Sequence, residues 1–167
     1  MFDLKGKVAL VTGAGRGMGK SHAILLAKQG AIVVITDVRT KECQSVVKEI
    51  KSNNGTAVCF KMDVSNAKDV TKVFDAVIKK FGRLDILVNN AGIYFSKPAL
   101  ELSEKDWDLI MSINLKGQFL CAQRAAKEMA KNKWGRIINI ASVASGQVGV
   151  GIFGGRTIQP QKEAFLV

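Results

Sequence analysis

The sequence predicts an α/β fold in which helices cover both faces of a doubly wound parallel sheet. Three observations support this prediction. Short apolar, β-branched runs alternate along the chain with segments of helical periodicity. A glycine-rich turn joins the first run to the first helical segment, and an aspartate closes the second run. Alternation of this kind is typical of parallel sheets, because each strand must cross over through a helix to reach its neighbour.

The expected strands are five short runs, most of them rich in valine and isoleucine, at residues 8–11, 32–35, 57–60, 86–88 and 136–140. The expected helices alternate with them, at residues 17–29, 41–53, 68–81 and 107–131. A glycine follows each helical segment and permits a left-handed cap there; these are Gly30, Gly55, Gly82 and Gly135. No repeat or linker divides the chain. We therefore expect one domain over residues 1–151, followed by an aberrant tail over residues 152–167.

The composition is that of a soluble globular protein. Of 167 residues, 47% are hydrophobic and 23% are charged. The apolar runs are far shorter than the roughly 20 residues that a membrane helix needs, and the N-terminus lacks the apolar core of a signal peptide. Cys43, Cys59 and Cys121 are widely spaced without a CxxC pair, which favours packing residues over a disulfide framework or a zinc site. We expect a cytoplasmic protein with no membrane contact and no metal.

The net charge of +11 raises the question of a nucleic-acid partner. The lysines are dispersed, with no run of five or more basic residues and no interleaved aromatic residues. This pattern is typical of solvated helix faces. We therefore expect no nucleic-acid binding.

Residues 12–19, Thr-Gly-Ala-Gly-Arg-Gly-Met-Gly, form the turn between the first strand and the first helix. Gly13, Gly17 and Gly19 would let the backbone approach a pyrophosphate, and the helix N-terminus offers unpaired amides and a positive dipole end. A glycine-rich turn is often only a tight turn. Here the strand before it and the helix after it favour a dinucleotide-binding loop, to which Arg16 and Met18 also contribute.

Asp37 stands at the end of the second strand, about twenty residues beyond this loop. A carboxylate there accepts hydrogen bonds from the hydroxyls of an adenosine ribose and repels a 2′-phosphate. NAD is therefore favoured over NADP, although Arg16 and Arg39 soften that preference. The alternative is that Asp37 only caps the next helix.

Together these residues resemble the short-chain dehydrogenase/reductase family, whose fold is Rossmann-like. The resemblance covers residues 1 to about 151, and it includes Asp63 after the third strand and Asn89-Asn-Ala-Gly92 after the fourth. It implies that Asp63 and Val64 border the adenine of the cofactor. It also implies that Asn90, Ala91 and Gly92 line the cofactor between its adenosine and nicotinamide halves. Taken alone, these residues would be an ordinary helix cap and a strand-ending turn.

The family transfers a hydride between nicotinamide and a carbonyl or alcohol carbon, using a tyrosine, a lysine, a serine and an asparagine. One group must exchange a proton with the substrate oxygen while another holds it. Asn114 matches the asparagine, although an asparagine within a helix can also bond only a neighbouring backbone carbonyl. Ser142, at the end of the fifth strand, matches the serine. The resemblance thus implies a secondary alcohol or ketone as substrate.

The chain departs from the family where Tyr-x-x-x-Lys is expected. It has Ile158-x-x-x-Lys162 and ends five residues later. Isoleucine cannot exchange a proton, and Pro160 interrupts any helix there. The only tyrosine, Tyr94, has no lysine four residues on and is a better candidate for lining the substrate cleft.

A shift of reading frame accounts for this departure. Residues 157–165 can be encoded as ACT ATT CAG CCT CAA AAG GAG GCA TTT. Without the first two bases the message reads TAT TCA GCC TCA AAA GGA GGC ATT, which encodes Tyr-Ser-Ala-Ser-Lys-Gly-Gly-Ile. We hypothesise a frame shift, natural or artefactual, between about Gly151 and Arg156.

Three functions compete at this point. The first is an NAD-dependent dehydrogenase, inactive in this form, with an incomplete sheet whose fifth strand is open. The second is a non-catalytic module that binds a dinucleotide or a partner, and the third, nucleic-acid binding, is disfavoured. The resemblance implies a homo-oligomer, but the helices through which the family usually pairs include one that has no counterpart here.

Overall fold

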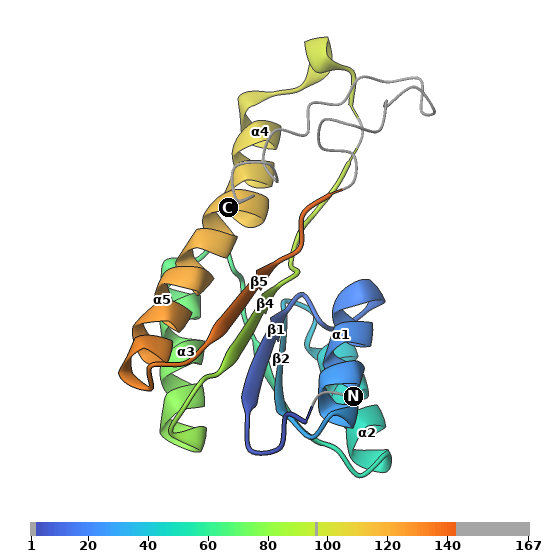
Figure 1. The fold of residues 1–167 in the computed structure, drawn as a ribbon. Helices are drawn as coiled ribbons and strands as arrows, with labels where there is room; N and C mark the ends of the chain where they lie inside the picture. The colour runs from blue at the N-terminus through green and yellow to red at the C-terminus, as the bar shows by residue number, and fades with distance from the viewer. Residues whose placement is uncertain (1–2, 96, 143–167) are drawn as a thin grey trace.

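The five-stranded sheet is the centre of the fold (Figure 1). The computed structural model describes residues 3–95 and 97–142. All the strand pairs are parallel, and the strands follow the order β3-β2-β1-β4-β5. They are β1 (Val8–Thr12), β2 (Ile32–Asp37), β3 (Thr56–Lys61), β4 (Ile86–Asn89) and β5 (Arg136–Asn139). The α/β prediction is confirmed, and the order reverses at β1, which creates a crevice between the loops after β1 and β4.

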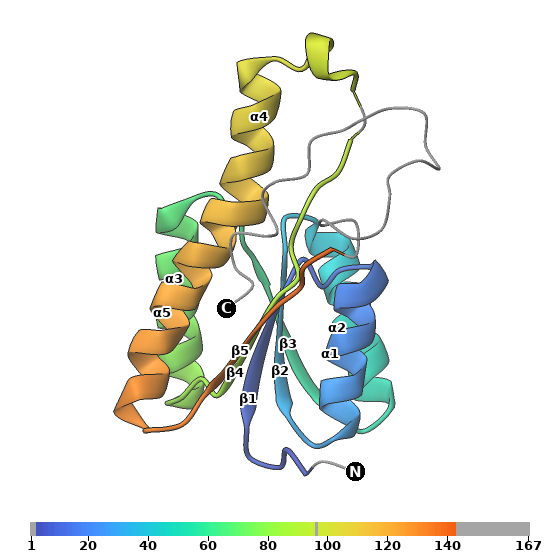
Figure 2. The same cartoon turned by 45° about the horizontal axis from the view of Figure 1, so that its top comes forward.

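Helices cover both faces of the sheet. In Figures 1 and 2, α1 (Gly17–Lys28) and α2 (Thr40–Ser52) lie on one side, and α3 (Ala67–Phe81) and α5 (Gly117–Lys131) lie on the other. A short 3-10 helix, η1 (Ala99–Glu101), precedes α4 (Glu104–Met111). β1 shows why both faces are needed: Val8 and Leu10 pack toward α3 and α5, whereas Ala9 and Val11 pack toward α1 and α2. A strand that is buried on both faces has a continuous run of apolar residues in its sequence.

The long helix expected over residues 107–131 differs from the prediction in two respects. It begins three residues earlier, because Ser103 and Asp106 form a capping box at the start of α4. It is also interrupted by a π-helical turn, η2 (Ser112–Lys116), between α4 and α5. Single π turns inside α-helices are frequent at functional sites.

Two of the four expected left-handed glycine caps occur. Gly30 and Gly82 have φ angles of 93° and 72°, whereas Asn54 and Lys133 occupy the left-handed region in place of the glycines that follow them. Gly55 has a different role. A Cβ atom on it would lie 2.7 Å from Cγ2 of Ile50, so the glycine permits close packing of α2 against β3.

The expectation that all three cysteines are simple packing residues is wrong. Cys43 of α2 and Cys59 of β3 form a disulfide, which sequence spacing did not reveal because it depends on the crossover between the two elements. Cys121 is a buried free thiol in α5. Burial raises its pKa to about 12.

At the β5 side of the sheet, Ile137 and Ile138 are partly exposed, with Ile138 at 45%. Within the described residues, β5 pairs only with β4. None of the helices described is long and apolar enough to cross a membrane. The same ranges hold no group of three or more His, Cys, Asp or Glu residues suited to a metal ion. The expected tail, residues 152–167, lies outside the described residues.

Candidate functional site

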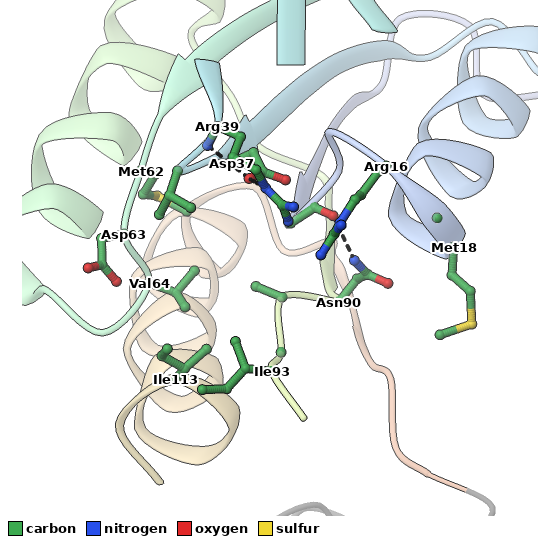
Figure 3. Close-up of a pocket in the computed structure, with 15 residues that line it drawn as sticks. Arg16, Met18, Asp37, Arg39, Met62, Asp63, Val64, Asn90, Ile93 and Ile113 are labelled. Carbon is green, nitrogen blue, oxygen red and sulfur yellow. Dashed lines mark hydrogen bonds and ion pairs between the residues drawn. The ribbon is translucent and has the colours of Figure 1, made fainter. Parts of the chain in front are cut away.

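A pocket lies at the carboxyl ends of the strands, where the loops after β1, β2, β3 and β4 converge (Figure 3). Its cavity volume is about 310 Å³. Open α/β sheets bind ligands in this place, outside the strand ends and at the point where the strand order reverses. The lining residues are Gly13, Arg16, Gly17, Met18, Asp37, Val38, Arg39, Met62, Asp63, Val64, Asn90, Ala91, Gly92, Ile93 and Ile113.

Residues 12–19, between β1 and α1, form a glycine loop that needs its glycines for two separate reasons. Gly13 and Gly17 have φ angles of 60° and 55°, which side-chain-bearing residues rarely adopt. A Cβ atom on Gly13 would also lie 2.8 Å from Cα of Ala91, and one on Gly19 would lie 2.6 Å from the carbonyl oxygen of Gly13. Gly19 is buried and is not among the residues that line the pocket. The loop therefore packs tightly against the end of β4 and leaves open space in front of Gly17.

The N-terminus of α1 faces this open space. Arg16 is the N-cap residue, and its side chain makes no capping hydrogen bond within the described residues. The first turn contains no acidic residue. Its backbone amides and positive dipole end thus favour an anion. Arg16 extends into the pocket and Met18 lies at its rim (Figure 3).

Asp37 is held at the end of β2 by three hydrogen bonds. Its Oδ2 accepts from the backbone N–H of Gly15 at 3.0 Å, and its Oδ1 accepts from the backbone N–H of Arg39 at 3.0 Å and from Nε of Arg39 at 3.4 Å. The residue is 4% exposed, yet it lines the pocket. It does not cap α2, whose N-cap residue is Arg39. Asp37 instead connects the glycine loop to the β2–α2 turn.

Asp63 and Val64 line the pocket on the β3 side, across from Met18 (Figure 3). The carboxylate of Asp63 accepts hydrogen bonds from the backbone N–H of Ser65 at 2.9 Å and from its hydroxyl at 2.7 Å. The cap of α3 is a different residue, Asn66. The Asp63 turn therefore shapes the loop without serving as the helix cap.

Asn90 and its neighbour Ala91 hold the β4 end against β1. The side-chain amide of Asn90 donates to the carbonyl oxygens of Thr12, at 2.9 Å, and of Gly13, at 3.1 Å. The hydroxyl oxygen of Thr12 accepts from the backbone N–H groups of Asn90 and Ala91, both at 3.0 Å. This network fixes the glycine loop relative to Gly92 and the rest of the pocket wall.

Asn114 lies in the π turn and is 2% exposed. Its Oδ1 accepts from the backbone N–H of Ile93 at 2.8 Å, and its Nδ2 donates to the carbonyl oxygen of Ile93 at 2.9 Å. It thus bonds a strand-end residue 21 positions away rather than a neighbouring carbonyl of its own helix. The π turn also places Ile113 beside Ile93 in the pocket (Figure 3).

Ser142 lies three residues beyond β5, at the carboxyl end of the strand. Neither it nor Asn114 is among the pocket-lining residues. Tyr94 is 63% exposed and follows the pocket residue Ile93. The position of Ile158, where the sequence departs from Tyr-x-x-x-Lys, lies outside the described residues.

Five lining residues have no place in the set of site residues predicted from the sequence: Val38, Arg39, Met62, Ile93 and Ile113. Arg39 alone had a signal, since it stands two positions after Asp37. The other four are apolar residues next to predicted site residues, and nothing in their own identity separates them from core residues.

Similarity to known proteins identifies the family of this chain. The family profile described as "short chain dehydrogenase" matches residues 7–154. The chain belongs to this family. Members of the short-chain dehydrogenase family are oxidoreductases that bind a nicotinamide dinucleotide.

Two curated relatives and one solved structure illustrate the similarity. The (2S)-[(R)-hydroxy(phenyl)methyl]succinyl-CoA dehydrogenase subunit BbsD of Thauera aromatica is 43% identical over 143 residues, which are 86% of this chain and 58% of the relative. A 3-oxoacyl-[acyl-carrier-protein] reductase of Synechocystis sp. is 43% identical over 145 residues, 86% of this chain and 59% of the relative. The crystal structure of a metagenomic short-chain oxidoreductase in complex with NADP has a TM-score of 0.81 and 37% identity, covering 84% of this chain and 64% of that one. The chain thus spans less than two thirds of these proteins.

Proposed function

We propose that this chain binds NAD(H) in the pocket at the strand ends, as the cofactor domain of an alcohol- or ketone-directed oxidoreductase. The observation that carries the proposal is the convergence of three features on one cavity. These are the glycine loop at the N-terminus of α1, the carboxylate of Asp37, and the Asn90–Gly92 segment that is hydrogen-bonded to that loop through Thr12.

The residues present fit a dinucleotide. The space in front of Gly17 and the backbone amides of the first turn of α1 suit its pyrophosphate. Asp37 suits the hydroxyls of the adenosine ribose, since its carboxylate keeps lone pairs beyond the three hydrogen bonds described above. Asp63 and Val64 would border the adenine. When bound, the cofactor supplies the nicotinamide carbon that gives or accepts the hydride.

NAD is the favoured cofactor because a buried carboxylate at Asp37 disfavours a 2′-phosphate. Two cations oppose this preference. Arg39 ion-pairs with Asp37, with 3.4 Å between Nε and Oδ1, and Arg16 reaches into the same pocket. A relative at 37% identity was solved with NADP. We therefore expect binding of both cofactors, with NAD the tighter.

The proposed reaction of the complete protein is hydride transfer between nicotinamide and a secondary alcohol or ketone. Ser142 would donate a hydrogen bond to the substrate oxygen. Asn114 would fix Ile93 and the pocket wall through its two backbone hydrogen bonds. The chain itself carries Ile158 where the family has a tyrosine, so we expect no turnover from it.

The isoleucine also favours the second candidate function, a non-catalytic module that binds the dinucleotide or a partner. The two candidates are separated by one pair of measurements on the chain as it stands. We expect NADH fluorescence to show saturable binding, and a panel of secondary alcohols and ketones to show no turnover. Detectable turnover would overturn the assignment of inactivity, and failure to bind NADH would overturn the cofactor site.

A further inference from the structure

The disulfide between Cys43 and Cys59 joins two elements beside the proposed cofactor pocket. Cys43 lies in the first turn of α2 and Cys59 lies in β3, where it pairs in register with Ile35 of β2. Ile35 is two residues before Asp37. The bond therefore fixes the start of α2 to the sheet, next to the strand end that presents the carboxylate.

A chain of backbone contacts connects this bond to Asp37. The backbone N–H of Cys43 donates to the carbonyl oxygen of Arg39 at 3.2 Å, and the backbone N–H of Arg39 donates to Oδ1 of Asp37 at 3.0 Å. The same helical turn also approaches the glycine loop. A Cβ atom on Gly15 would lie 3.1 Å from Cβ of Glu42 and 2.9 Å from Oδ2 of Asp37. A displacement of the first turn of α2 would therefore move Asp37, at the proposed ribose end of the pocket. It would also move the glycine loop, at the proposed pyrophosphate end.

The surroundings of the two sulfur atoms suit both the reduced and the oxidised state. Sγ of Cys43 lies 3.3 Å from the carbonyl oxygen of Ile35. As a thiol, Cys43 could donate a hydrogen bond to this oxygen. Cys43 is fully buried, whereas Cys59 lies in an edge strand and is partly exposed. Cys59 is therefore the more exposed residue of the pair, and we take it as the one that reacts first with an external reagent.

We propose that Cys43 and Cys59 form a reversible oxidation site that tightens dinucleotide binding when the disulfide is present. The oxidant is a low-molecular-weight disulfide such as glutathione disulfide. The thiolate of Cys59 attacks one of its sulfur atoms, which forms a mixed disulfide and expels one thiolate. Cys43, as its thiolate, then displaces the second thiolate, so that two protein thiols are oxidised, one disulfide is reduced to two thiols, and the two protons go to those thiols.

Tighter binding follows from preorganisation. The disulfide limits the motion of the first turn of α2 before the ligand arrives, so less conformational freedom is lost on binding. This inference rests on the proposed function, since it assumes that the pocket takes a dinucleotide.

The test uses the full chain in two forms, one treated with glutathione disulfide and one with a reducing phosphine. Thiol titration in denaturant should count one free thiol in the oxidised form and three in the reduced form, because the chain has three cysteines and Cys121 is outside the bond. NADH titration should show a dissociation constant at least about threefold lower for the oxidised form. Cys59→Ser should abolish the difference between the two treatments, and Cys121→Ala should preserve it.

The outcomes separate this inference from the proposed function. Three free thiols after oxidation, or equal NADH affinity in the two forms, would overturn the redox inference and leave the cofactor site standing. Absence of NADH binding in both forms would overturn both. A redox difference that persists in Cys59→Ser would assign the effect to another group and overturn the role of this disulfide.

Discussion

The side-chain amide of Asn90 donates a hydrogen bond to the backbone carbonyl oxygen of Thr12 at 2.9 Å, while the Thr12 hydroxyl accepts one from the Asn90 backbone at 3.0 Å. The two residues stand 78 positions apart, at the ends of β4 and β1. These two hydrogen bonds join the ends of β4 and β1 at the point where the strand order reverses. The shape of the proposed cofactor pocket therefore depends on it.

Replacement of Asn90 by alanine should lower both stability and dinucleotide affinity. It leaves the carbonyl oxygens of Thr12 and Gly13 without their partner, which costs about 1–3 kcal/mol in the free energy of unfolding. Urea unfolding and NADH titration would measure the two effects. Asn53→Ala is the matched control. The side-chain amide of Asn53 donates to the backbone carbonyl oxygen of Glu49 in an exposed position at the end of α2. Equal losses in the two variants would contradict the role given to Asn90.

Gly13→Ala should abolish NADH binding, because its Cβ atom would lie 2.8 Å from Cα of Ala91 and would push the loop out of place. Gly6→Ala provides a control for backbone strain alone. Gly6 has a φ angle of 76°, but a Cβ atom there would meet nothing within 4 Å. Both variants should lose about 1 kcal/mol of stability from the left-handed conformation. Loss of NADH affinity in Gly6→Ala would show that strain, and not the loop contact, is responsible.

Asp37→Asn should weaken NAD binding about tenfold while leaving NADP binding unchanged or stronger, since a charged acceptor of the ribose hydroxyls becomes neutral. The amide retains an oxygen that can accept from Gly15, so the loop should remain in place. Calorimetric titration with both cofactors would test this, with Asp108→Asn on α4 as the control. An equal loss of affinity for the two cofactors would instead assign Asp37 a purely structural role.

The start of α4 should loosen in acid. Lys97 and Ser103 hydrogen-bond to Asp106 and lower the pKa of its carboxyl to about 2. Because the pKa is lower in the folded protein than in the unfolded chain, where it is about 4, this contribution to stability is complete above about pH 4 and is lost as the pH falls toward 2. Hydrogen exchange of the amides in the first turn of α4 should accelerate over that range, and Asp106→Asn should accelerate it already at pH 7. An exchange rate in the variant equal to that of the wild type at pH 7 would contradict the capping role.

The coding DNA should contain the missing motif in another frame. Once two bases are skipped, the codons of residues 157–162 should read TAT, then codons for Ser-Ala-Ser or a close variant, then AAA, which requires that the codon of Gln161 ends in A. Sequencing of the gene decides this. Synonymous codons that do not restore Tyr-x-x-x-Lys would disprove the frame-shift hypothesis.

Sequence reasoning succeeded where local patterns act over short distances. The apolar runs of β1 to β5 predicted the parallel α/β sheet, and the glycine-rich stretch beginning at Gly13 predicted the turn between β1 and α1, because strand burial and turn chemistry depend on neighbouring residues. It failed at the π turn beginning at Ser112 and at the Cys43–Cys59 bond, both of which depend on tertiary contacts. The hydrogen bond between Asn114 and Ile93 also depends on tertiary structure, since no local rule predicts a partner 21 residues away.

The most direct test of the account is to map NAD⁺ binding residue by residue, by recording backbone amide NMR spectra of the chain with increasing cofactor. We predict saturable shifts grouped at Gly13–Gly19, Asp37, Asp63–Val64 and Asn90–Gly92, and absent from the face around Ile137. Shifts confined to other surfaces, or no shifts at millimolar cofactor, would contradict the central claim that this pocket is a dinucleotide site.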